Sequence, residues 1–118
     1  MRKYVYPATL VDVKDAARIE LLIDLGFDIK IHEIIRLDKI WVPTIHSVNQ
    51  DLHRAYSAKR FVEENLRSAY KIRVHSQRRE HDLFFGDVMY KTKKDSKFKS
   101  IGQQLLKSGF GELANACK

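Results

Sequence analysis

Lysines are concentrated in one short segment of the chain and suggest contact with phosphate groups. Residues 91–99 include five lysines in nine positions. Clustered cations neutralise the phosphates of a nucleic acid, although a run of like charges is also typical of a solvated loop. We predict that this segment binds phosphate and that a nearby arginine pair contributes, which gives these candidate residues: Arg78, Arg79, Lys93, Lys94 and Lys97.

Residue types that commonly bind metals or carry out catalysis form no recognisable motif. The five histidines lack the spacing of a zinc module, and the chain has neither a Cys-x-x-Cys nor a His-Glu-x-x-His sequence. His81 and Asp82 are adjacent, but no serine or cysteine nucleophile motif accompanies them. We therefore predict no catalytic residue, no metal site and no cofactor.

Length and charge limit the class of protein and the kind of partner. The chain has 118 residues, 44% of them hydrophobic, which suits one domain over residues 1–118. Residues 60–118 hold 13 basic against 7 acidic residues, so they carry most of the net charge of +7 and favour an anionic partner. The lone Cys117 and the lack of a long apolar run favour a cytoplasmic protein that does not enter a membrane.

The candidate residues must be positioned by a fold that the hydrophobic pattern outlines. Three stretches rich in β-branched and aromatic residues predict a meander of strands over residues 4–13, 19–25 and 29–37. Apolar residues at intervals of three and four then predict a helix over residues 51–69. Two more strands are predicted over residues 70–75 and 83–90, with Tyr70, Phe84 and Phe85 facing the core.

A short closing helix completes the predicted order of elements. It begins at Ser100, which starts a Ser-x-x-Gln capping pattern, and it ends near Gly109. The order is β-β-β-α-β-β-α, an α+β arrangement that matches a five-stranded Greek-key barrel of the OB type.

Several segments resemble the staphylococcal nuclease family in the order in which that family has them. They are YPATLVDVKD (6–15), IEL (19–21), RLDKIWVP (36–43), AKRFV (58–62), FGDVMY (85–90) and IGQQLLKSGF (101–110). The resemblance covers nearly the whole chain and implies the same OB barrel with its helices. Function does not follow from a fold, so the matching site positions need separate inspection.

At those positions the resemblance implies that the nuclease chemistry is absent. The family uses two aspartates that bind calcium, a glutamate that acts as general base and a second phosphate-binding arginine. These positions fall on Ala17, Trp41, Thr44 and Leu83, and none of these can supply the required group. Only the first phosphate-binding arginine is retained, as Arg36, and its guanidinium can hold a phosphate without a metal.

Two of these positions remain candidates for binding, each with a structural alternative. Arg36 either contacts phosphate or forms an ion pair with Asp38, Asp87 or another neighbour. Trp41 either stacks on a base, anchors a protein partner or fills the space that the metal site would occupy.

The leading expectation is therefore a non-catalytic, staphylococcal-nuclease-like domain that binds DNA or RNA through a basic surface. One alternative is a protein-interaction or inhibitor module, in which the altered loops contact a protein. A more remote alternative is a nuclease whose metal site is rebuilt from other acids, which are mostly solvated when they lie in turns. The sequence leaves the oligomeric state open.

Overall fold

The structure is a computed structural model that describes residues 4–38, 40–41, 52–80 and 83–113. Five long strands form the main sheet: β1 (Tyr4–Asp15), β2 (Arg18–Gly26), β3 (Ile29–Leu37), β5 (Lys71–Glu80) and β6 (Leu83–Lys91). Three two-residue strands are also present: β4 (Ile40–Trp41), β7 (Lys99–Ser100) and β8 (Glu112–Leu113). The helices are α1 (Leu52–Arg67) and α2 (Ile101–Lys107).

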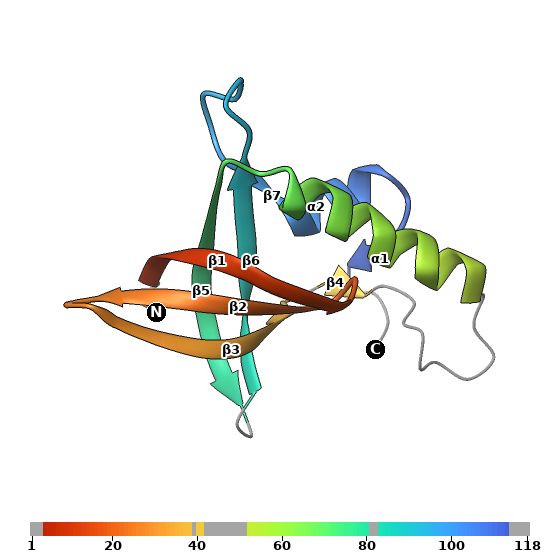
Figure 1. Ribbon diagram of the computed structural model, residues 1–118. Helices are drawn as coiled ribbons and strands as arrows, with labels where there is room; N and C mark the ends of the chain where they lie inside the picture. Colours follow the sequence, from red (N-terminus) through yellow and green to blue (C-terminus); the bar gives the residue numbers. More distant parts are fainter. Residues whose placement is uncertain (1–3, 39, 42–51, 81–82, 114–118) are drawn as a thin grey trace.

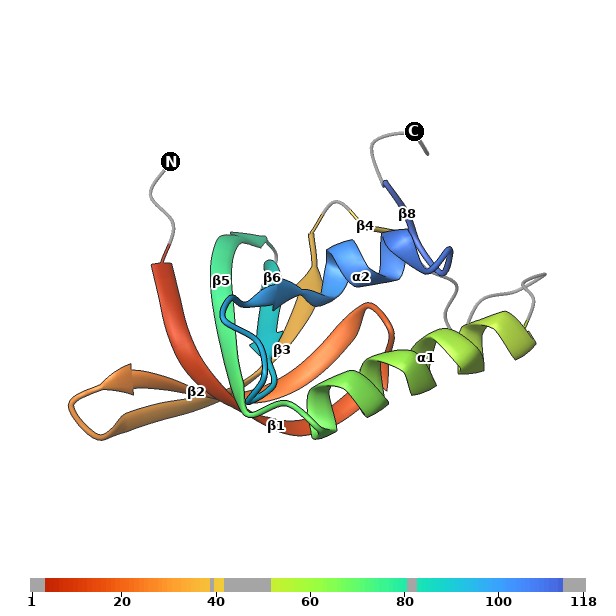
Figure 2. The ribbon, with the colours of Figure 1, turned by 90° about the horizontal axis from the view of Figure 1, so that it is seen from above.

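The five long strands close into a barrel (Figures 1 and 2). β1, β2 and β3 form an antiparallel meander, β5 pairs with the other edge of β1, and β6 pairs with β5. A parallel pairing of β3 with β6 closes the ring, and β7 adds to β6 outside it. This is the OB-like barrel with helices that the sequence predicted.

The barrel interior is built from apolar residues at alternate positions along the strands. Ile19, Leu21 and Ile23 of β2 are buried, and Ile35 and Leu37 of β3 join them. Successive side chains of a strand point to opposite faces, so the intervening residues face outward. The alternation along each strand therefore determines which of its residues form the core.

Helix α1 buries one apolar stripe against the barrel. Its buried residues, Ala55, Ala58, Val62 and Leu66, recur at intervals of three and four, as the pattern predicted. Residue 51 lies outside the described residues, and the helix ends two residues before the predicted end at residue 69. Among the residues that the structure describes, no helix is long and apolar enough to cross a membrane.

The predicted cap of α2 is confirmed and is linked to β6. The Ser100 Oγ accepts a hydrogen bond from the Gln103 backbone N–H at 3.2 Å, and it donates to Asp87 Oδ1 at 2.8 Å. Burial raises the pKa of Asp87, while its hydrogen bond from Ser100 acts in the opposite direction. Asp87 thus connects the start of α2 to the barrel wall.

Two details of the sheet differ from the prediction. β5 continues to Glu80, beyond the predicted end at His75, because a register shift between Ser76 and Arg78 lets a polar segment keep pairing with β6. Tyr70 was expected in the core of a strand, and this was wrong. It precedes β5 and is 55% exposed.

β5 and β6 approach each other most closely at Gly86. A Cβ atom at this position would lie 2.5 Å from the His75 backbone oxygen, a distance that no side chain tolerates. The Gly86 carbonyl also accepts a hydrogen bond from the Asp38 N–H at 3.1 Å. Glycine at this position therefore allows the barrel to close where β3, β5 and β6 meet.

Candidate nucleic-acid interface

The predicted site residues lie on two separate surfaces of the barrel. Arg36 on β3 and Arg79 on β5 lie where β3, β5 and β6 meet, whereas Lys93, Lys94 and Lys97 lie in the loop between β6 and β7. Arg78 belongs to β5 and Trp41 to β4, but their side chains are outside the described set. Thr44, which the resemblance aligned with a general base, is also outside it.

The first surface, here called the arginine surface, consists of Arg18, Arg36 and Phe85 on the outer face of the sheet. Arg79 and Phe84 lie nearby on the opposite face, where Phe84 packs against the core. The guanidinium carbon of Arg36 lies 5.8 Å from the centre of the Phe85 ring, and that of Arg79 lies 5.2 Å from the centre of the Phe84 ring. Arg18 is the direct partner of Arg36 across the β2–β3 ladder. Rings beneath guanidinium groups hold these cations at the barrel wall.

Arg36 is available for a ligand on this surface. It is exposed on the outer face of β3 and lines a cavity of about 370 Å³, whose other charged or titratable lining residues are Arg18, Glu20, His32 and Glu33. Among the described residues no ion pair joins a carboxylate to Arg36, and Asp87 Oδ1 accepts a hydrogen bond from the Ser100 hydroxyl. Of the two alternatives for Arg36, the structure thus gives no support to the ion pair with Asp87.

Asp15 is buried at the edge of this surface, contrary to the expectation that acids in these turns are solvated. Its carboxylate is 1% exposed and accepts hydrogen bonds from the Ala17 N–H at 2.9 Å and from Arg18 Nε at 2.9 Å. Arg18 Nη2 also lies 2.8 Å from Asp15 Oδ2. The charge of this carboxylate is therefore neutralised by an arginine three residues along the chain.

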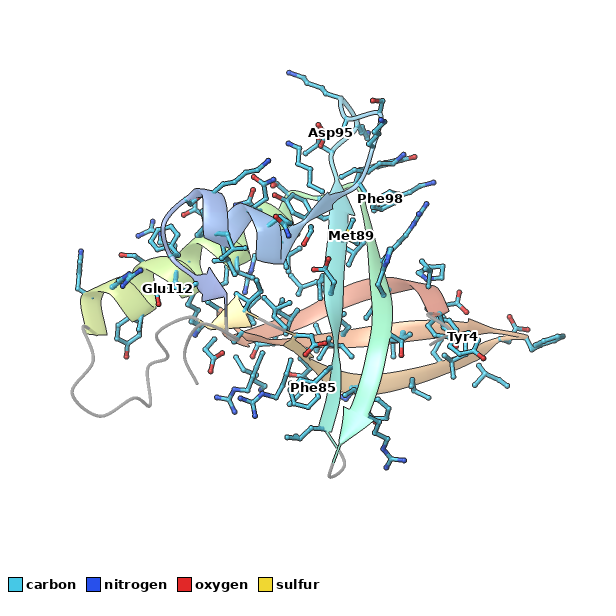
Figure 3. The ribbon with its side chains drawn as sticks, turned by 180° about the vertical axis from the view of Figure 1, so that it is seen from behind. Tyr4, Phe85, Met89, Asp95, Phe98 and Glu112 are labelled. Carbon is cyan, nitrogen blue, oxygen red and sulfur yellow. The ribbon has the colours of Figure 1, made fainter. Side chains whose placement is uncertain are left out.

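The second surface, here called the lysine-loop surface, is built around two aromatic rings. It consists of Tyr70, Lys71, Arg73, Lys91, Lys93, Lys94, Lys97 and Phe98. Figure 3 shows Phe98 near one end of β6 and Phe85 toward the other end. Between Phe85 and Lys91 the strand rises by about 20 Å, so the two surfaces are distinct.

Each ring of the lysine-loop surface has two cations over it. The Arg73 guanidinium carbon lies 3.8 Å from the centre of the Phe98 ring, and Lys91 Nζ lies 5.1 Å from it. Around Tyr70, Lys71 Nζ lies at 5.7 Å and Lys93 Nζ at 5.6 Å. Cations are thereby drawn to Tyr70, which is exposed, and to Phe98, which is half-buried.

Asp95 gives the lysine loop a defined shape. Its Oδ2 accepts hydrogen bonds from the Thr92 N–H at 3.0 Å and from the Thr92 hydroxyl at 3.1 Å. The bond from the Thr92 backbone is the main cause that lowers the pKa of Asp95, and Lys99 contributes. The only described acid in the loop thus faces inward to its own backbone, while Lys93, Lys94 and Lys97 are exposed.

The positive charge of this surface is not neutralised by the described part of the chain. No carboxylate there forms an ion pair with the cations that surround the two rings or with Lys94 and Lys97. The nearest acids are engaged elsewhere, since Asp95 contacts Lys99 and Glu63 contacts Arg67. The arrangement is suited to bind an anion.

A groove lies beside the rings. It has a volume of about 650 Å³ and runs between the first residues of β1, the end of α1 and the start of β5. Its floor is apolar, with Leu10, Leu66 and Ile72, and cations from Arg67, Lys71 and Arg73 line its rim.

Sequence reasoning identified the lysines but missed the rings and their other cations. Lys71 and Arg73 alternate with the buried Ile72 and Val74, so the pattern already placed them outside. No sequence signal brings Phe98 onto Arg73, because the contact depends on how the loop folds back over β5.

The described histidines and acids do not gather into a metal site: no group of three or more of these residues or cysteines lies together. His32 pairs with Glu20, and Glu20 also contacts Lys14 at 3.2 Å. His75 Nε2 is buried and has no hydrogen-bond partner within the described structure. His46, His81 and Cys117 are outside the described residues.

Comparison with known proteins adds no relative from which a function can be transferred. The sequence matches no protein-family model and no curated protein.

Proposed function

We propose that this chain binds single-stranded nucleic acid through the lysine-loop surface and does not cleave it. In this proposal it is a relative of the staphylococcal nucleases in which the catalytic positions are substituted. The observation that carries the proposal is the pair of rings, Tyr70 and Phe98, each with two cations over it. Within the described part of the chain no carboxylate forms an ion pair with those cations.

Single strands suit this surface better than duplexes. A ring stacks on a base only when the base is unstacked from its neighbours, as it is in a single strand, and each such stack contributes about 1–3 kcal/mol. The surrounding lysines contact the phosphates of whichever sequence is present, so sequence preference is expected to be weak. DNA and RNA both satisfy these requirements.

The residues near the former nuclease site support binding without cleavage. Hydrolysis needs a hard cation and a general base, and Ala17 and Leu83 stand where the family has a metal ligand and a phosphate-binding arginine. Asp15, the nearest buried carboxylate, is already paired with Arg18. Arg36 remains exposed as an additional contact for phosphate.

Fluorescence anisotropy with labelled single-stranded and duplex DNA and RNA tests this proposal. We expect tighter binding to single strands, a slope of log affinity against log salt of roughly −3 to −3.5, and no effect of calcium or chelator. If no nucleic acid binds even at low salt, the proposal is contradicted and a protein partner is favoured. Cleavage that depends on a divalent ion contradicts it and favours a nuclease.

Two exposed tyrosines provide a matched pair of variants. Tyr70 is 55% exposed beside the cations, and Tyr56 is 57% exposed on α1. We expect Tyr70→Ala to weaken single-strand binding about tenfold without changing the salt slope, because a stack is lost and no charge is removed. Tyr56→Ala should leave the affinity unchanged. Equal effects of the two substitutions would show that Tyr70 does not stack on a base.

A further inference from the structure

The turn between β2 and β3 holds a strained conformation. Gly26 pairs with Ile29, so Phe27 and Asp28 form a two-residue turn, with φ of 54° and 61°. Such a turn favours asparagine and glycine, whereas a bulky residue such as phenylalanine rarely adopts a positive φ. The Phe27 side chain is also 98% exposed, so no packing in this chain compensates for the strain. Strain retained at an exposed residue points to a role in binding.

The turn presents an apolar tip with negative charge. Leu25 is 37% exposed and Ile29 is 53% exposed, so three apolar side chains lie together at the tip. Asp28 is exposed, and Asp24 accepts a hydrogen bond from the Gly26 N–H at 2.8 Å. The hairpin continues beyond Ile23, the last β2 residue paired with β1, and it projects from the barrel (Figure 1).

The groove described above is complementary to this tip in polarity and charge. Its floor is apolar, and Lys71 and Arg73 lie at its rim beside Arg67, which pairs with Glu63. The tip is apolar and carries the exposed Asp28, while Lys30 lies opposite Asp24 across the hairpin. The tip cannot enter the groove of its own chain, because the hairpin points away from the end of α1 (Figures 1 and 2). A second copy of this chain presents the same groove to the tip.

We propose that the β2–β3 tip of one copy inserts Phe27 into the groove of a second copy. We place the two copies about a two-fold axis, so that each tip fills the groove of the other and the contact closes as a dimer rather than extending as a head-to-tail chain. Asp28 of the tip faces the cations of the rim, which fixes the direction of insertion. This inference does not depend on the proposed function, although the groove includes Tyr70, Arg73 and Phe98 of the lysine-loop surface.

Sedimentation velocity tests the inference, with protein that has been treated with nuclease and freed of nucleic acid. The protein concentration runs from about 5 µM to about 500 µM at moderate salt, because weak dimers form in this range. We expect a concentration-dependent shift from monomer to dimer. Phe27→Asn should weaken the association at least tenfold, whereas Phe27→Tyr, which keeps the ring, should retain it. Asparagine suits the turn, so loss of the dimer cannot be attributed to misfolding, and a thermal melt should show unchanged or higher stability.

Reversing the charges of Asp28 and Arg73 tests whether the tip binds in this groove. Asp28→Lys and Arg73→Glu should each weaken the dimer, and the double variant should recover part of the affinity, because the ion pair is restored in reverse. A wild-type protein that remains monomeric at every concentration overturns the inference. So does association that Phe27→Asn leaves unchanged.

Discussion

At the scale of single residues, Asp95 determines how the lysine loop presents its charges. The pKa of Asp95 is lowered mainly by the hydrogen bond from the Thr92 backbone, so the folded state favours the carboxylate. Its contribution to stability is therefore complete above the unfolded pKa of 3.8 and is lost as pH falls through the lower, folded value. Asp95→Asn should destabilise the protein at neutral pH, and thermal melts should show the difference from wild type disappearing in acid.

Asp87 shows the opposite dependence, because burial raises its pKa. The stability of the wild type therefore falls as pH rises from the unfolded pKa of 3.8 through the higher, folded pKa. Asp87→Asn removes this penalty and keeps an oxygen for the Ser100 hydroxyl, so the variant should gain stability relative to wild type at pH 7 and lose that gain in acid. Urea denaturation at several pH values measures the difference. Asp87→Ala, which leaves Ser100 without this acceptor, should cost about 1 kcal/mol instead.

At the scale of elements, the closure of the barrel depends on Gly86 in β6. A methyl group there meets the His75 carbonyl oxygen at 2.5 Å, and both atoms belong to paired strands that cannot easily separate. Gly86→Ala should therefore destabilise the fold by about 2 kcal/mol or more, as measured by urea denaturation. Gly102→Ala is the control, since its added methyl group meets side chains alone: Ile40 at 3.2 Å, and Ser100 and Asp87 at the ordinary contact distances of 3.6 and 3.7 Å. It should therefore cost much less. Equal losses would show that the β5–β6 approach is not limiting.

The same elements show how far the sequence predicts this fold. The three strands of the meander and the helix α1 carry clear periods, because each buries one face, and their predicted ranges differ from the structure by a few residues. β4, β7 and β8 have two residues each, too few for any period. The extension of β5 through Arg79 is polar and follows a register shift, so its pairing with β6 appears only in three dimensions.

At the scale of the whole molecule, the charge of a residue does not indicate which binding surface it belongs to, whereas its place in the barrel does. The lysine run predicted part of one surface and the family resemblance predicted Arg36 of the other, but all the candidates were expected to form one binding site. Arg36 and Lys93 belong to different regions of the barrel because the direction of β6 separates them. Assigning each cation to its surface requires knowledge of the β3–β6 pairing, which joins residues almost fifty positions apart. A single sequence carries no signal for such a contact.

Two surfaces about 20 Å apart along β6 make binding depend on the length of the strand. We expect an oligonucleotide of about 4 nucleotides to occupy the lysine-loop surface alone, and one of about 12 nucleotides to reach Arg36 as well, which lies within the site sizes of OB barrels. Neutralising Lys93, Lys94 and Lys97 together should weaken both and flatten the salt slope by about 2 units. Arg36→Gln should weaken only the longer oligonucleotide, by about threefold or more, because one phosphate contact is lost. Arg60→Gln on α1 removes the same charge at a residue that pairs with Glu64, so it measures the effect of net charge alone. If Arg36→Gln weakens both lengths equally, or neither beyond this control, the two surfaces do not share one strand.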